Sequence, residues 1–224
     1  MGKIDIVNLS KVPLGEKIAN ILRREIMLGI LKEDEHLIEQ SLSNRFQTSR
    51  GPIRDAIMKL EMEGLIKRNY SGRAAVQEFQ IKDVKNLYNV RKLIEMQAIT
   101  SIVVTDKDIE SLKKQIKTMK KAYSKNHKDI YADLDFHKYI VGLSKNKALI
   151  MVWDSLSDMF HTLIDVTTDY QVFDQEKTIS YHEKILNEII ENNINNAAHY
   201  LSKHLEMATD YYCYMIEKIK KEGN

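Results

Sequence analysis

The chain has 224 residues, of which 43% are hydrophobic and 29% charged, and its formal net charge is +2. This length suits two compact domains, and the balance of apolar and charged residues excludes an intrinsically disordered protein. No apolar run reaches the roughly 18–20 residues of a membrane span. The N-terminal residues lack the apolar core of a signal peptide. Cys213 is the single cysteine. We therefore expect a cytoplasmic protein without disulfides and without a membrane partner.

The first quarter of the sequence contains three predicted helices. An apolar helical stripe begins after Pro13 and stops at Gly29, and a second, short helix is expected over residues 38–46. Ser49 then provides an N-cap for a third helix, and Pro52 falls in its first turn, where the missing N–H costs little. The short connection between the second and third helices is typical of a helix-turn-helix.

A β-hairpin is predicted to follow the third helix. Residues 65–69 and 73–78 are expected to form two short strands, and Ser71 and Gly72 supply the turn between them. Three helices and a hairpin in this order are typical of a winged helix-turn-helix, so we predict a DNA-binding domain over residues 1–78.

The remaining residues, 79–224, are predicted to form an all-α antiparallel helical bundle. Proline is absent there, no strand pattern is present, and amphipathic helices follow one another. The expected helices span residues 81–102, a stretch after Thr105, 129–143, 148–167, 175–191 and 195–220. The predicted fold class is therefore mainly α, with a small β-hairpin wing in the N-terminal domain.

The predicted DNA-binding domain carries a concentrated positive charge. Residues 45–73 contain seven arginines and lysines against three acidic residues, a net charge of +4. Arg50 and Arg54 lie four residues apart and share the outward face of the third helix, while Arg73 lies beside the tip of the hairpin. Arginine recognises guanine through two parallel hydrogen bonds. For a single arginine, a solvated surface charge is the simpler interpretation.

The longer pattern favours the DNA interpretation. Residues 48–66 read TSRGPIRDAIMKLEMEGLI, which resembles the helix-turn-helix signature of the GntR superfamily. This resemblance implies that Arg50 and Arg54 read a guanine in each half-site of the DNA. Thr48 and Ser49 lie at the N-terminus of the third helix, where hydroxyls and free N–H groups bond phosphates.

Two positions depart from this signature. Gly51 stands where the family usually has threonine, so one phosphate or base contact is expected to be missing. Ala74 stands where the wing usually has a second glycine, which affects contacts at the wing tip.

Four polar side chains fall on or beside the inward faces of the predicted bundle helices. Helical spacing places His137, His182 and His204 on the apolar stripes of three different helices, and Asp133 lies one turn before His137. One carboxylate and three imidazoles together form a nitrogen and oxygen shell suited to a first-row transition metal. Each histidine taken alone is more often a hydrogen-bonded core residue.

The sequence around these residues resembles a known effector domain. Residues 133–140, DLDFHKYI, resemble the D-x-x-x-H motif of the FCD domain that follows GntR winged helices, and His182 and His204 resemble its two later histidines. The chain thus resembles the fatty-acid-regulator (FadR) subfamily. The resemblance implies that Asp133, His137, His182 and His204 hold Zn²⁺, with Ni²⁺ or Mn²⁺ as alternatives, and leave open positions for a carboxylate effector or water.

Arg91 is the candidate effector-binding residue. Steps of three and four residues place it on the inward face of the helix predicted over residues 81–102, and Glu95 lies one turn further on. Two interpretations carry equal weight: an internal ion pair with Glu95, or an anion clamp that faces a carboxylate held by the metal.

These features predict a homodimeric transcriptional regulator that is not an enzyme. Each protomer places one recognition helix on double-stranded DNA with a palindromic operator, and a small carboxylic acid in the bundle controls DNA affinity. Repression is the commoner behaviour in the family that the sequence resembles. Two alternatives stay open: a metal-dependent hydrolase, disfavoured by the absence of an H-E-x-x-H motif and of an evident general base, and a DNA-binding module whose metal is purely structural.

Overall fold

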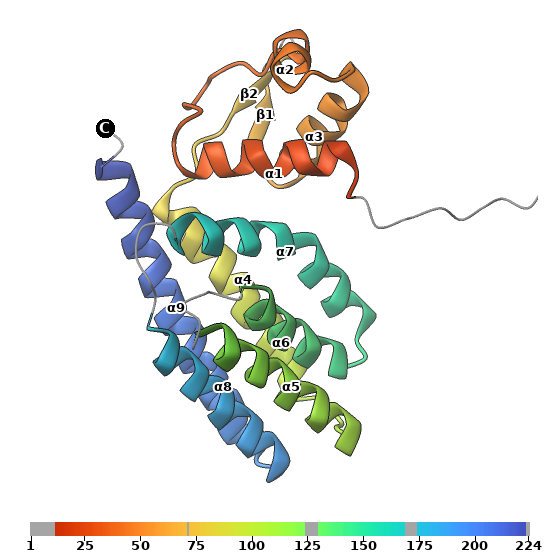
Figure 1. Cartoon of the computed structure of the whole chain (residues 1–224), viewed down its shortest axis with the longest axis vertical. Coiled ribbons are helices and arrows are strands. Elements are labelled where there is room, and N and C mark those ends of the chain that lie inside the picture. Colours follow the sequence, from red (N-terminus) through yellow and green to blue (C-terminus); the bar gives the residue numbers. More distant parts are fainter. Residues whose placement is uncertain (1–11, 71, 124–129, 169–173, 223–224) are drawn as a thin grey trace, which may run out of the picture. The chain divides into compact units, whose positions relative to one another are not determined.

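The computed structural model describes residues 12–70, 72–123, 130–168 and 174–222 (Figure 1). The chain divides into two compact units, Met1–Phe79 and Gln80–Asn224. The elements in chain order are α1 (Leu14–Met27), α2 (Glu39–Phe46), α3 (Arg50–Met62), β1 (Ile66–Arg68), β2 (Ala74–Val76), α4 (Ile81–Ile99), α5 (Asp106–Tyr123), α6 (Ile130–Leu143), α7 (Lys147–Thr168), α8 (Gln175–Ile190) and α9 (Ile194–Glu222). None of the helices in the described residues combines the length and the apolar content that a bilayer crossing requires.

The N-terminal unit is built on the pair of helices α1 and α3. The apolar residues of α1 share one face, and Ile18 and Leu22 are fully buried in the unit that α1 and α3 form. Arg23 of α1 donates from Nε and Nη2 to the two carboxylate oxygens of Glu63, at 2.7 and 2.6 Å, and its side chain is completely buried. This two-pronged pair fixes how the C-terminal end of α3 meets α1.

A tight turn joins α2 to α3. Gln47 adopts a left-handed conformation with φ of 49°, and the N–H of Thr48 donates to the carbonyl of Ser43 at 3.0 Å. Ser49 takes the N-cap position before Arg50, but its hydroxyl makes no capping hydrogen bond. The predicted N-cap position is therefore confirmed, although the Ser49 hydroxyl does not close the helix end with a hydrogen bond.

The wing is shorter than the sequence pattern predicts. Strands β1 and β2 pair antiparallel, with Ile66 opposite Val76, and each predicted strand extends beyond the observed one at both ends. At the turn, the Asn69 side chain accepts a hydrogen bond from the Arg73 N–H at 3.0 Å, and at the opposite end the Leu65 N–H donates to the Leu60 carbonyl of α3 at 2.9 Å. Ser71, one of the two expected turn residues, lies outside the described residues.

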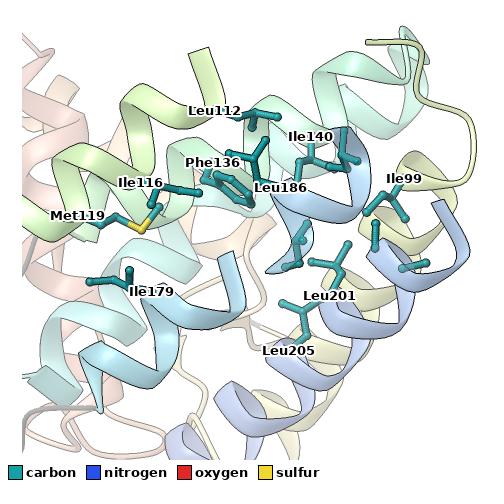
Figure 2. Packing of buried hydrophobic residues seen from close by; sticks show 14 of the residues in the cluster. Ile99, Leu112, Ile116, Met119, Phe136, Ile140, Ile179, Leu186, Leu201 and Leu205 are labelled. Atoms are coloured by element: carbon teal, nitrogen blue, oxygen red, sulfur yellow. The ribbon is translucent and has the colours of Figure 1, made fainter. Parts of the chain in front are cut away.

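The C-terminal unit is a helical bundle. Helix α9 packs against α4, α7 and α8, α6 packs against α4, α5 and α7, and α5 also packs against α8. Figure 2 shows one part of the core, where apolar side chains from α4, α5, α6, α8 and α9 interdigitate. Its labelled members are Ile99, Leu112, Ile116, Met119, Phe136, Ile140, Ile179, Leu186, Leu201 and Leu205. This packing brings α6, α8 and α9, which carry the predicted metal ligands, into one core.

Several helix boundaries differ from the predicted ones, by up to three residues, and one predicted boundary lies outside the described residues. Helix α4 ends at Ile99, before the expected residue 102, because the hydroxyls of Thr100 and Ser101 donate to carbonyls of the last turn at 3.0 Å. Helix α6 begins at Ile130, and the predicted start at residue 129 lies outside the described residues. The predicted fold class, a winged helix-turn-helix followed by a helical bundle, is confirmed.

Candidate metal centre and nucleic-acid interface

The four predicted metal ligands lie together in the C-terminal unit. Asp133 and His137 are one turn apart on α6, His182 is on α8, and His204 is on α9. One ligand atom from each residue lies within 4.8 Å of those of the others. The three histidines are buried, and the side chain of Asp133 is 23% exposed. Helix packing therefore converts four inward-facing positions into one cluster.

The ring nitrogens of this cluster face one another at the spacing of metal ligands. His137 Nε2 lies 3.2 Å from His204 Nε2 and 3.2 Å from His182 Nε2. His182 Nε2 also lies 3.3 Å from Asp133 Oδ1. Metal–nitrogen bonds of about 2.1 Å place neighbouring ligand nitrogens about 3.0 Å apart in an octahedral site and about 3.4 Å apart in a tetrahedral one. The observed distances fall between these values, so the donor set fits a first-row transition metal.

The protonation of the rings also suits a metal. The Nδ1 atom of His182 lies 2.8 Å from the backbone carbonyl of Thr178, which only accepts hydrogen bonds, so Nδ1 carries a hydrogen and Nε2 is the ring atom directed at the cluster. Burial holds the pKa of His137 and of His204 well below the usual range. Both rings are therefore neutral, which is the form that binds metal ions.

Arg91 is buried in the same unit, on α4. Its Nε donates to Glu95 Oε1 at 2.7 Å, so the expected internal ion pair is present, and its Nη1 donates to the Tyr88 hydroxyl at 3.3 Å. The guanidinium also lies 5.1–5.3 Å from the ring centroids of Tyr88, Trp153 and Phe160. Nη2, although buried, has no hydrogen-bond partner among the described residues. An unpaired buried donor lowers the free energy of unfolding by about 1–3 kcal/mol. An oxygen ligand that accepts a hydrogen bond from Nη2 therefore removes this destabilisation.

One contact near this site has no counterpart in the sequence pattern. Glu95 Oε2 lies 2.6 Å from His137 Nδ1, which links α4 to α6. A contact between two helices leaves no periodic signal, so sequence reasoning missed it. The aromatic surroundings of Arg91 were missed as well, although Trp153 is the only tryptophan and lies two helical turns before Phe160 on α7.

The predicted DNA-contacting residues lie in the N-terminal unit. Ser49, Arg50, Arg54 and Arg73 are exposed, and Thr48 is half-buried. Arg54 and Arg73 line the same hollow of about 550 Å³, which lies between the start of α2, α3 and the hairpin. The third helix and the wing thus present basic side chains to one concave surface.

Side chains of α2 hold two of these arginines. Arg54 Nε donates to Glu39 Oε2 at 2.8 Å, and Arg50 donates to the side-chain oxygen of Gln40. The Arg54 side chain is 60% exposed, so this pair is weak and its guanidinium is free to exchange the carboxylate for a base or phosphate. A Cβ added at Gly51 meets only the Ser49 hydroxyl oxygen, at 3.9 Å, so packing does not require glycine there.

A helix-turn-helix with an exposed basic face, followed by a helical unit, defines a DNA-binding regulator. Residues 14–76 match the family described as bacterial regulatory proteins, gntR family, and residues 86–207 match the FCD domain. The chain belongs to the GntR family of transcriptional regulators and carries an FCD domain. The resemblance that its motifs indicated is thereby confirmed.

Individual relatives agree with this assignment. An uncharacterized HTH-type transcriptional regulator of Bacillus subtilis, YdhC, is 25% identical over 90% of this chain and 92% of its own length. The gluconate operon transcriptional repressor of the same species is 28% identical over 70% of this chain and 65% of its own length. The solved structure of Lar, which controls the expression of the Listeria monocytogenes agr system, has a TM-score of 0.68 at 20% identity and covers 92% of this chain and 98% of that one. This last likeness concerns the fold.

Proposed function

We propose that this GntR-family regulator is a repressor whose affinity for its DNA operator is controlled by a small carboxylic acid bound at a metal centre in the FCD domain. Asp133, His137, His182 and His204 would hold the ion, Zn²⁺ in the first instance, with Ni²⁺ or Mn²⁺ as alternatives. When bound, the ion supplies a Lewis-acidic anchor for a carboxylate oxygen. Repression is favoured because one of the relatives described above is named as a repressor.

The observation that carries this proposal is the pairing of the ligand cluster with a buried, incompletely paired arginine. Glu95 contacts both Arg91 and His137, so the guanidinium and the cluster belong to one hydrogen-bonded unit. Nη2 of Arg91, which has no partner within the described ranges, is the donor we assign to a ligand. A carboxylate has two oxygens, so one can bind the ion while the other accepts from a guanidinium.

The winged helix supplies the DNA contacts in this proposal. Arg50 and Arg54 on the exposed face of α3 read guanine in the major groove, because an arginine fork bonds O6 and N7 together. Thr48 and Ser49 bond phosphates at the N-terminus of α3, and the absence of a capping hydrogen bond from the Ser49 hydroxyl supports this role. Arg73, beside the hairpin, contacts phosphate or the minor groove.

A second copy of the chain completes the regulator. Two recognition helices related by two-fold symmetry match a palindromic operator. On α4, Val90 and Leu93 are 39% and 72% exposed, and the exposed neighbours Asn86, Asn89 and Gln97 carry no charge, while the 35% exposed Lys92 is paired with Glu206. Charge depletion around exposed apolar residues is typical of the centre of an interface, so we propose that α4 contributes to a homodimer contact.

Control of DNA affinity requires that the acid distinguish between two arrangements of the dimer. A ligand that binds both arrangements equally shifts neither population, however tightly it binds. The acid bound in the FCD domain therefore must favour the arrangement whose recognition helices do not match the operator spacing.

The test combines elemental analysis with DNA binding. Protein purified without chelators is expected to contain about one transition metal per chain, and the His137→Ala/His182→Ala variant to contain none, because the cluster loses two ligands. His199→Ala, which removes an exposed histidine of α9, is the matched control and should retain the metal. DNA selected from a random pool then serves in fluorescence anisotropy titrations with a panel of small organic acids.

The outcomes separate the proposal from its alternatives. An acid that weakens DNA binding in the wild type, but not in the double variant, supports the repressor. Metal removal that unfolds the C-terminal unit, with no acid affecting DNA binding, indicates a purely structural metal. Chemical conversion of one of the acids by the metal-loaded protein indicates a hydrolase, and a metal-free wild type that takes up none on titration contradicts the metal centre.

A further inference from the structure

We propose that Glu95 is a positioning residue that holds His137 in the tautomer able to bind metal and connects that ring to Arg91. This inference rests on the metal centre of the proposed function. Its central claim concerns the metal-free protein, however, so it can be tested whether or not metal binds.

The hydrogen bonds of Glu95 define its role. Glu95 is completely buried, and its two oxygens have different partners: Oε1 accepts from Arg91 Nε at 2.7 Å, and Oε2 lies 2.6 Å from His137 Nδ1. Arg91 Nε can only donate, so Oε1 accepts from it, and we assign to Glu95 the ionised form that pairs with the guanidinium, in which Oε2 also only accepts hydrogen bonds. The hydrogen between Glu95 and His137 therefore belongs to Nδ1, and Nε2 of His137 presents its lone pair to His182 and His204.

The other two rings of the cluster are held differently. His182 donates its Nδ1 hydrogen to the backbone carbonyl of Thr178, and His204 Nδ1 has no hydrogen-bond partner among the described residues. Of the three rings, His137 is thus the one whose Nδ1 partner is a side chain that also holds Arg91. His137 also lies 3.2 Å from both of the other rings, so its tautomer decides whether the cluster offers three converging lone pairs.

This arrangement makes the metal centre and the anion donor interdependent. An oxygen ligand at Arg91 Nη2 acts on a guanidinium whose Nε is bound to Glu95, and Glu95 in turn orients a metal ligand. Coupling between two binding sites is reciprocal, so the factor by which metal changes carboxylate affinity through Glu95 equals the factor by which carboxylate changes metal affinity.

The first measurement is the tautomeric state of the histidines in the metal-free full chain. In chelator-treated protein with nitrogen-labelled histidine, long-range proton–nitrogen spectra should show His137 and His182 both with hydrogen on Nδ1. In Glu95→Gln, the amide oxygen is drawn to Arg91 and the amide N–H₂ faces His137, which favours the Nε2–H form of that ring. His182 is an internal control, because its partner is backbone and the substitution leaves it unchanged.

The second measurement is Zn²⁺ affinity by competition with a chromophoric chelator. Loss of an outer partner of a ligand histidine lowers affinity by about 10–100-fold, so Glu95→Gln should bind Zn²⁺ that much more weakly. Glu110→Gln, which removes an exposed carboxylate on α5, is the matched control. If Glu95→Gln fails to fold with an unpaired Arg91, then Arg91→Met/Glu95→Leu, which removes both charges and leaves His137 Nδ1 without its carboxylate acceptor, carries the comparison.

The outcomes test the role of Glu95 and the presence of a metal centre separately. A wild-type His137 with its hydrogen on Nε2 overturns the inference without any variant. An unchanged His137 tautomer in Glu95→Gln, with Zn²⁺ affinity within about twofold of the wild type, also overturns it. If the wild type binds no Zn²⁺, the proposed metal centre fails, and the tautomer spectra still decide whether Glu95 positions His137.

Discussion

Replacing Arg91 by methionine removes one partner of a fully buried ion pair, and the structure allows the cost to be worked out. The Arg91 and Glu95 side chains are 2% and 0% exposed, and their contact is 2.7 Å long. Removing one partner of such a pair typically costs about 3–5 kcal/mol, because the other charge stays buried without compensation. Glu95 retains the hydrogen bond from His137, so we expect the lower end of this range, about 3 kcal/mol.

The assay is urea unfolding of chelator-treated protein, followed by circular dichroism. Urea unfolding gives the change in unfolding free energy directly. In thermal unfolding of a chain of this size, the same change of about 3 kcal/mol corresponds to a fall in melting temperature of about 6–12 °C. Lys92→Met is the matched control, because Lys92 is the next residue on α4 and its pair with Glu206 is 35% and 43% exposed. Exposed pairs contribute about 0–1 kcal/mol, so this variant should unfold almost as the wild type does.

The double variant Arg91→Met/Glu95→Gln separates charge from packing. Removing both charges should recover part of the stability lost in Arg91→Met, because no unpaired carboxylate is left in the core. Two results would contradict this reasoning. One is an unfolding free energy of Arg91→Met no lower than that of Lys92→Met. The other is a double variant whose unfolding free energy is lower than that of Arg91→Met, because the two substitutions would then simply add.

Three further predictions concern DNA, assembly and pH. Arg54→Ala should weaken binding of selected operator DNA by about 5–150-fold in anisotropy titrations, the value of one guanine contact, and an equal loss on random DNA would show that Arg54 contacts only phosphate. Leu93→Glu should convert the dimer to monomer in sedimentation experiments, because it places a charge at the proposed interface, and an unchanged dimer would move the interface away from α4. The pKa values of His137 and His204 are depressed by burial below their ordinary 6.5. The unfolded chain therefore takes up protons that the folded chain does not, so the metal-free protein should lose unfolding free energy as the pH falls below about 6.5, by up to about 1.4 kcal/mol per pH unit for each ring. His204→Ala should reduce that slope in urea titrations at several pH values, and a flat profile in the wild type would mean that the folded rings are protonated.

Local patterns in the sequence predicted the inward faces of the bundle helices and the helix-turn-helix. Helical spacing is set by the backbone, so the steps around His137, His182 and His204 identified the inward face of each helix before any packing was known. The run from Thr48 to Ile66 contains its own turn, N-terminus and apolar stripe, and for that reason the helix-turn-helix could be predicted from it. Glu95 was recognised as a partner of Arg91 because both lie on one helix, one turn apart.

The sequence did not determine which inward faces meet, because that depends on how helices cross. The convergence of α6, α8 and α9 placed four ligand atoms within 4.8 Å of one another, and no periodicity within a single helix contains that distance. The same packing decided that Glu95 reaches His137 on another helix. It also placed Trp153 and Phe160 around Arg91, whose Nη2 has no hydrogen-bond partner in the described part of the chain. Side-chain hydrogen bonds at element ends, such as that of Asn69 in the wing, likewise shortened strands that their composition favoured. Sequence periodicity thus supplied the candidate residues, and tertiary packing decided which of them act together.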